Sequence, residues 1–183
     1  MPVVISMLRG VNLAAHKRVK MDALRELYLS LKLRNPQTYL QSGNVIFQTK
    51  EQDLVLLATR IESAIERKFG FSSDVILRTP ADLRDVITRN PFAGRPDIEP
   101  NKLLVTFLRC DPGVEACDKI RQMKPYPDEV RIDGREMYTY YTSVARPVIS
   151  WAVIEKALKT SGTARNWNSV TRLLEMAEAL ETS

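Results

Sequence analysis

The sequence is poor in the residues that most often carry catalysis or cross-link a fold. Its 183 residues include one histidine, His16, and two cysteines, Cys110 and Cys117. A Ser-His-Asp triad could therefore use only His16. A zinc site of the usual composition would need a second histidine, which the sequence lacks. The cysteines have no metal-ligating neighbours, so we expect reduced thiols. No metal and no cofactor are therefore expected.

Long hydrophobic runs and glycine-rich loops are also missing. No run of about 18 apolar residues occurs, and the first residues lack a cationic leader with a cleavage site. We therefore expect a cytoplasmic protein with no membrane partner. Neither GxGxxG nor GxxxxGK occurs, because no second glycine follows Gly10 before Lys17, which disfavours nucleotide folds of those types. The acidic residues are scattered on helix faces, unlike those of a two-metal site or a catalytic carboxylate pair.

The positive charge is concentrated near the amino terminus. The net charge is +5, and the first fifty residues carry eight Lys or Arg against two acidic residues. The next fifty residues carry seven Lys or Arg against nine acidic residues. No acidic residue interrupts the series Arg9, Lys17, Arg18 and Lys20, as an anion-binding loop requires. A solvated loop with ordinary surface lysines is the alternative explanation.

The hydrophobic pattern predicts alternating strands and helices. Strands are predicted at 3–8, 38–47 as a hairpin, 74–78, 102–108 and 128–141 as a second hairpin. Helices are predicted at 21–32, 52–69, 81–90, 114–124, 148–159 and 166–180. Glycine turns at Gly43 and Gly134 support the two hairpins.

The two halves of the chain repeat one order of elements, which predicts a duplicated α+β fold. We predict two intertwined ferredoxin-like βαββα repeats with mainly antiparallel sheets and helices packed on them. The first half is expected at 1–80, a helix and a Pro-rich connection at 81–101, and the second half with the C-terminal helices at 102–183. Together they are expected to form one compact unit.

Three polar turns are candidates for a common site. RGVN (9–12) follows the first strand, QSGN (41–44) is the first hairpin turn, and TARN (163–166) opens the last helix. Such turns beside a helix start supply free backbone N–H groups, which suit phosphate or carboxylate, and arginines add bidentate grips. The predicted ligand-binding residues are Arg9, Asn12, Lys17, Gln41, Ser42, Asn44, Arg165 and Asn168.

Each turn also has a purely structural explanation. Gly43 suits a positive φ, and Ser42 or Asn44 can satisfy the turn backbone. In the last segment, Thr163 or Asn166 can cap the helix.

The tryptophan of the last segment, Trp167, lies on an apolar helical stripe, which favours the core over a stacking role. Arg165 and Asn168 are explained by neither capping nor this stripe, so they are the stronger ligand candidates of that segment.

Several motifs together resemble a known family. They are LRGVN, Lys20-Met21 before a helix, TYLQSGNVIF, FGF at 69–71, NPF at 90–92, FL at 107–108, GREMY at 134–138 and TARNWNSV at 163–170. In order and spacing this series resembles the domain-of-unknown-function 1697 family of bacterial proteins, over essentially the whole chain. The resemblance implies a compact α+β fold with ferredoxin-like repeats, and it implies no activity.

The sequence departs from the family pattern after RGVN. Ala14 and Ala15 stand where the family usually has a glycine pair, and Ser169 stands where it often has threonine. Alanine is disfavoured by about 1 kcal/mol in the left-handed conformations that let a backbone approach a phosphate. An anion loop here would therefore depend on side chains such as Arg9, Lys17 and Arg18.

Three functions follow as hypotheses. The first is a small binding protein with a basic polar pocket for a phosphorylated or nucleotide-like ligand. The second is RNA or DNA binding, favoured by the basic amino-terminal half, although no RNP-like aromatic run occurs. The third is an enzyme acting on a small anionic substrate, held by residues such as Asn12 and Arg165, with His16 or a carboxylate moving a proton. Catalytic residues and the oligomeric state stay open, and a purely structural or partner-binding role is the remaining alternative.

Overall fold

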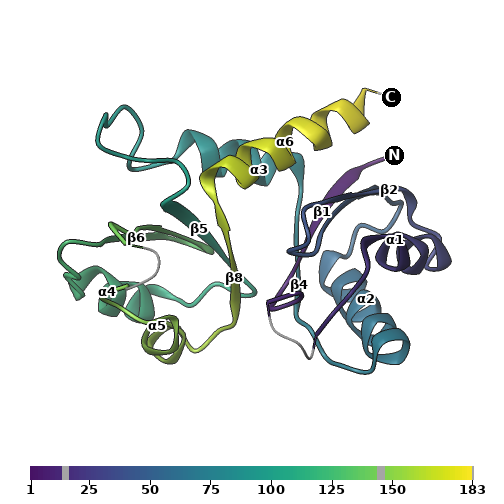
Figure 1. Ribbon diagram of the computed structural model, residues 1–183, viewed down its shortest axis with the longest axis horizontal. Helices are drawn as coiled ribbons and strands as arrows, with labels where there is room; N and C mark the ends of the chain where they lie inside the picture. The colour runs from purple at the N-terminus through teal and green to yellow at the C-terminus, as the bar shows by residue number, and fades with distance from the viewer. Residues whose placement is uncertain (14–16, 144–146, 183) are drawn as a thin grey trace. The chain divides into compact units, whose positions relative to one another are not determined.

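The computed structural model describes residues 1–13, 17–143 and 147–182. These residues form two four-stranded antiparallel sheets and six helices, so the chain is a mixed α+β protein (Figure 1). The strands are β1 (Val3–Leu8), β2 (Arg34–Tyr39), β3 (Asn44–Gln48), β4 (Val75–Arg78), β5 (Leu103–Leu108), β6 (Glu129–Asp133), β7 (Glu136–Tyr140) and β8 (Gly162–Asn166). The helices are α1 (Met21–Ser30), α2 (Leu54–Phe69), α3 (Pro80–Thr88), α4 (Val114–Gln122), α5 (Trp151–Leu158) and α6 (Trp167–Glu181).

The chain divides into two compact units. Unit 1 comprises residues 1–84 and 172–183, and unit 2 comprises residues 85–171. The sheet order is β2-β3-β1-β4 in unit 1 and β6-β7-β5-β8 in unit 2, so the same pattern occurs twice. Each sheet is built from one continuous stretch of chain, and the prediction of intertwined repeats is therefore wrong for the sheets. The end of α6 nevertheless belongs to unit 1.

In unit 1, α1 and α2 cover one face of the sheet (Figure 1). Tyr28 of α1 and Phe47 of β3 meet edge to face with ring centroids 5.2 Å apart. The Tyr28 hydroxyl shares a hydrogen bond of 2.7 Å with the hydroxyl of Ser6, so the one polar atom that this ring buries is satisfied. These contacts fix the position of α1, whose first turn borders the candidate site described below.

The two ends of α2 carry strong local signals. The carboxylate of Asp53 accepts hydrogen bonds from the backbone N–H groups of Val55 and Leu56, which caps the helix start. Gly70 ends the helix in the left-handed conformation at φ 78°, as the sequence predicts.

The opposite face of the unit 1 sheet is buried as well. Ile5 and Met7 of β1, Ile46 of β3 and Ile76 of β4 are at most 2% exposed. Arg78 of β4, on the same face by strand alternation, is 1% exposed. The central strands of this sheet therefore leave no open face among the described residues.

In unit 2, α4 and α5 cover one face of the sheet, with Cys117 and Ile154 in the shared core. The Pro-rich connection before β5 is anchored by Phe92, which is 3% exposed. The guanidinium of Arg95 lies 5.5 Å from the Phe92 ring centroid and donates to the carboxylate of Glu129 at 2.8 Å and 3.0 Å. An aromatic anchor and an ion pair thus hold a segment that has no regular structure of its own.

The segment TARN differs from its prediction. It forms β8, an edge strand paired with β5, and is not a turn. The helix begins directly after it, because the side-chain oxygen of Asn166 accepts a hydrogen bond of 2.9 Å from the backbone N–H of Ser169. The capping role predicted for Asn166 is confirmed. Trp167, predicted to lie in the core, is only partly buried.

Candidate anion-binding site

Asn12 joins the RGVN and QSGN turns within unit 1. Its side-chain N–H groups donate to the backbone oxygens of Gln41 at 2.7 Å and Val19 at 3.0 Å. Its side-chain oxygen accepts from the backbone N–H of Val19 at 2.9 Å. The residue adopts φ 56°, a left-handed conformation that asparagine tolerates better than most residues. Asn12 therefore builds the site by holding two loops together, and its amide is used for that purpose.

Gly43 allows the same two turns to approach each other. It has φ 77°, and a Cβ at this position would lie 2.5 Å from Cγ2 of Val11 and 2.9 Å from Cβ of Leu8. The backbone N–H of Leu8 also donates to the Gly43 oxygen at 2.9 Å. Both the conformation and the contact require glycine here.

The two predicted cationic ligands of this region, Arg9 and Lys17, form contacts within the protein. Arg9 forms an ion pair of 3.3 Å with Asp74. Lys17 donates to the backbone oxygen of Ser72 at 2.9 Å and lies 5.8 Å from the ring centroid of Phe71. Their side chains secure the loop between β1 and α1 against the segment before β4.

The hairpin turn is held by Asn44, which is fully buried. Its side-chain N–H groups donate to the Tyr39 oxygen at 2.8 Å and to the Ser42 hydroxyl at 3.0 Å. These contacts fit the structural interpretation of Ser42 and Asn44. By contrast, the side chain of Gln41 is exposed and makes no hydrogen bond with any other described residue.

The two predicted residues of the last segment lie in unit 2. Arg165 is 7% exposed and donates to the Thr163 hydroxyl and the Ala164 oxygen, both at 2.8 Å. Burial lowers the pKa of the Arg165 guanidinium to about 10, because an apolar surrounding disfavours the charged form. Asn168 is exposed in the first turn of α6. A pocket shared by all three polar segments stays a prediction.

A hollow of about 620 Å³ lies where α1 begins. It is lined by Asn12, Arg18, Val19, Lys20, Met21, Asp22 and Gln41. Lys20 occupies the cap position with an extended backbone and gives no side-chain cap. The backbone N–H groups of Met21, Asp22 and Ala23 have no acceptor among the described residues. Three donors at the positive end of a helix dipole are therefore available to a ligand.

Two free cations border this hollow. Arg18 and Lys20 are exposed, and neither forms an ion pair or a side-chain hydrogen bond with another described residue. The one carboxylate of the lining, Asp22, is paired with Arg25. The hollow is consequently positive in balance, with Gln41 as an uncharged donor and acceptor at its edge.

Lys20, the cation at the helix start, is absent from the ligand residues that the sequence predicts. A sequence signal for it exists: Lys20 precedes the predicted helix where Ser, Thr, Asp or Asn would be expected as a cap. A helix that starts without a capping side chain leaves its first N–H groups open. Arg18 belongs to the basic loop that the sequence does identify.

The described residues offer little for other chemistry. They contain no group of three His, Cys, Asp or Glu side chains that could hold a metal ion. His16, Ala14 and Ala15 lie outside the residues that the structure describes. Across the described ranges, no helix is long and apolar enough to cross a membrane.

Fold and site together define a mixed α+β protein with two similar sheet-and-helix units and a basic hollow at one helix start. Residues 1–138 match the family model described as protein of unknown function, DUF1697. The chain therefore belongs to the DUF1697 family, as its motifs predict. No match was found among curated proteins. The solved structure of a conserved bacterial protein from Streptococcus pneumoniae is similar with a TM-score of 0.71 and 18% identity, covering 97% of this chain and 99% of that one. At this identity, the likeness concerns the fold alone.

Proposed function

We propose that the protein is a small cytoplasmic binding protein whose hollow at the start of α1 takes a phosphorylated or nucleotide-like ligand. The observation that carries this proposal is the uncapped helix start. The backbone N–H groups of Met21 and Asp22 have no acceptor among the described residues, and these two residues line the hollow together with Arg18 and Lys20. Such a combination of free amides, helix dipole and cations stabilises a phosphate or carboxylate.

The size of the hollow fits a small molecule. Its volume of about 620 Å³ lies within the range of about 300 to 1,000 Å³ found for small-molecule sites. An inorganic phosphate would fill a small part of it, so the remaining space suits the organic part of a phosphate ester. Gln41 offers both a donor and an acceptor to that part.

Each unit is inferred to be a ferredoxin-like repeat. The element order is strand-helix-strand-strand-helix-strand in both, and the edge-to-edge order of the strands is equivalent. This assignment supports a duplication, and it carries no information about the ligand.

Binding of phosphate ligands to the full chain tests the proposal. Inorganic phosphate, nucleotides and sugar phosphates would be compared by isothermal titration calorimetry. We expect at least one to bind, and Arg18→Ala to weaken its binding about tenfold, since one charge-assisted hydrogen bond contributes about 1.5 to 3 kcal/mol. Arg135→Ala is the matched control, because Arg135 is exposed in unit 2 and its side chain has no ion pair or hydrogen bond within the described residues.

Two outcomes would count against the proposal. One is the absence of binding by every anion in the panel, and the other is an equal effect of the Arg18 and Arg135 variants.

A further inference from the structure

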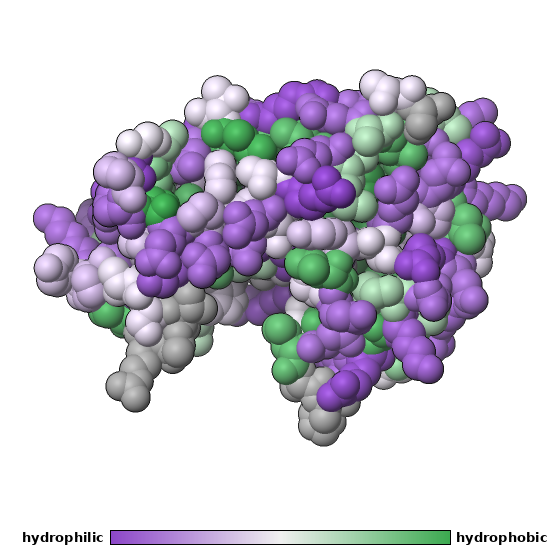
Figure 2. Space-filling view, turned by 45° about the horizontal axis from the view of Figure 1, so that its top comes forward, coloured by the Kyte–Doolittle hydropathy of each residue, from purple (hydrophilic) through white to green (hydrophobic). Residues whose placement is uncertain are grey.

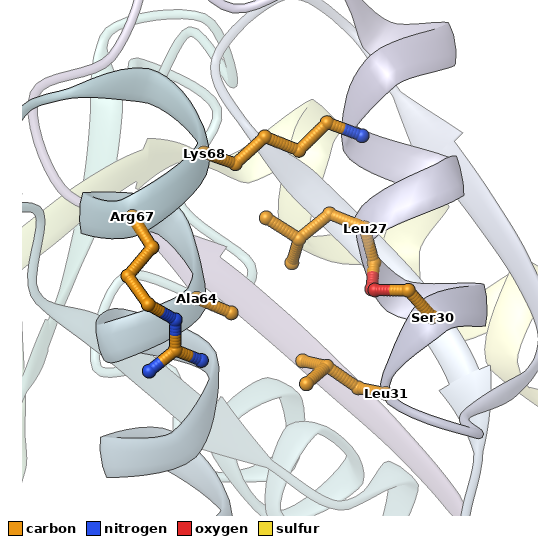
Figure 3. A pocket seen from close by; sticks show the side chains of 6 residues that line it. All are labelled: Leu27, Ser30, Leu31, Ala64, Arg67 and Lys68. Carbon is orange, nitrogen blue, oxygen red and sulfur yellow. The ribbon is translucent and has the colours of Figure 1, made fainter.

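A second hollow, of about 360 Å³, lies between α1 and α2 of unit 1 (Figure 3). Its floor is apolar: Leu27 and Leu31 of α1 and Ala64 of α2 point into the gap between the helices. The helices are bridged on either side of it. Lys68 donates to the Ala23 oxygen at 3.0 Å, and Arg60 donates to the Leu31 oxygen at 3.3 Å. Two hydrogen bonds therefore join the helices that form the walls of the hollow.

The charged residues that line this hollow are all of one sign. Arg67 and Lys68 line it, and no acidic residue does. Lys68 pairs with Glu26 at 3.5 Å, and the nearby Arg60 pairs with Glu51 at 3.8 Å. Arg67 alone makes no ion pair and no side-chain hydrogen bond with any described residue. One free guanidinium thus borders an apolar floor.

An exposed apolar side chain, Leu56, lies on α2 at some distance from the hollow. Leu56, which is half exposed, lies one turn before Arg60, and residues four apart share a helix face. On the face that Figure 2 shows, hydrophobic residues occur in small groups among hydrophilic ones. The apolar floor between α1 and α2, beside the unpaired guanidinium of Arg67, has the form of a groove that recognises a protein segment.

We propose that this groove docks an acidic protein segment, which inserts an aliphatic or aromatic side chain between α1 and α2 and places a carboxylate on Arg67. The volume suits one such side chain and is at the lower limit for a small-molecule site. Charge complementarity selects the sign of the partner, because the cationic rim would repel a basic segment. The proposal is independent of ligand binding at the start of α1.

The test uses the full chain and a short fluorescent peptide of glutamates flanking two leucines, followed by anisotropy. Two matched peptides are the controls: lysines replace the glutamates in one, and serines replace the leucines in the other. The acidic leucine peptide should bind, and both controls should bind at least about tenfold more weakly. Arg67→Glu should weaken binding about tenfold or more, whereas Arg135→Glu, with the same change in net charge, should change it less than about twofold.

Amide chemical shifts then locate the contact. They should move at Leu27, Leu31 and Ala64 and stay unchanged at Lys20 and Met21. The proposal is overturned if the acidic peptide does not bind, if the lysine peptide binds equally, or if both arginine variants weaken binding alike. Shifts centred on Lys20 would also overturn it, because the peptide would then occupy the anion site.

Discussion

At the scale of single residues, the candidate site depends on two uncharged residues, Asn12 and Gly43. Asn12 uses both of its amide hydrogens and its oxygen on the backbone of Val19 and Gln41. Gly43 contributes by having no side chain, since Val11 occupies the space where a Cβ would be. The two turns that border the hollow are thus held to each other by uncharged residues, whereas Arg18 and Lys20 line it.

Replacement of Gly43 by alanine should destabilise the protein strongly. A positive φ costs an alanine about 1 kcal/mol, and displacement of Val11 and Leu8 adds about 1 to 3 kcal/mol. We expect a loss of about 2 to 4 kcal/mol in the free energy of unfolding, measured by urea denaturation. Gly10→Ala is the control, because Gly10 has φ 68° with open space around it and should lose about 1 kcal/mol. Equal losses in the two variants would contradict the packing argument.

The residue scale also explains why the site could be predicted only in part. Sequence identifies the basic loop and the two turns, and these do meet through Asn12 and Gln41. It does not reveal that Arg9 has Asp74 as a partner 65 positions later, or that Lys17 reaches Ser72. Whether a cation is free depends on such long-range contacts, which no local pattern contains.

At the scale of elements, α1 and α2 differ in how they begin. The carboxylate of Asp53 caps α2 by accepting hydrogen bonds from two backbone N–H groups. At the corresponding position of α1, Lys20 has the backbone conformation of a cap but no side chain that can accept a hydrogen bond. A helix that starts in this way lacks about 1 kcal/mol of stability that a capping side chain would contribute. Its first backbone N–H groups remain as hydrogen-bond donors for a ligand.

Substitution of Lys20 by serine should separate stability from binding. The serine hydroxyl can cap the helix, so the free energy of unfolding should rise by about 0.5 to 1 kcal/mol. The same change removes a cation and occupies an N–H group, so phosphate affinity should fall about tenfold or more. Asp53→Ala serves as the reverse control: it should lose about 1 kcal/mol of stability while phosphate affinity stays constant. Unchanged affinity in Lys20→Ser would indicate that any anion binds elsewhere.

Elements with an apolar face are the ones that sequence predicts well. The sequence pattern predicts all six helices and seven of the eight strands, and all of these except β2 bury apolar residues. The missed strand, β8, contains Gly162, Thr163 and the buried Arg165, and its polar residues resemble a helix cap. Its strand character comes from pairing with β5, a contact that joins residues more than fifty positions apart.

At the scale of the whole molecule, the fold bears on the nucleic-acid alternative. RNA-binding sheets commonly stack bases on exposed aromatic residues. Here Phe47, Tyr138 and Tyr140 are at most 7% exposed. A nucleic acid would therefore find phosphate contacts rather than a stacking surface.

The salt dependence of oligonucleotide binding distinguishes the two functions. If a single strand binds only at the hollow at the start of α1, Arg18 and Lys20 are the lining cations that have no partner among the described residues. For about two phosphates neutralised on a single strand, the logarithm of the binding constant should fall with the logarithm of salt concentration at a slope of about −1.4. A labelled single strand, titrated at several salt concentrations, measures this slope, and the double variant of Arg18 and Lys20 to alanine should abolish it. A slope of about −4 or steeper that survives in the double variant would mean an extended nucleic-acid surface, because a pair of cations cannot release that many counterions.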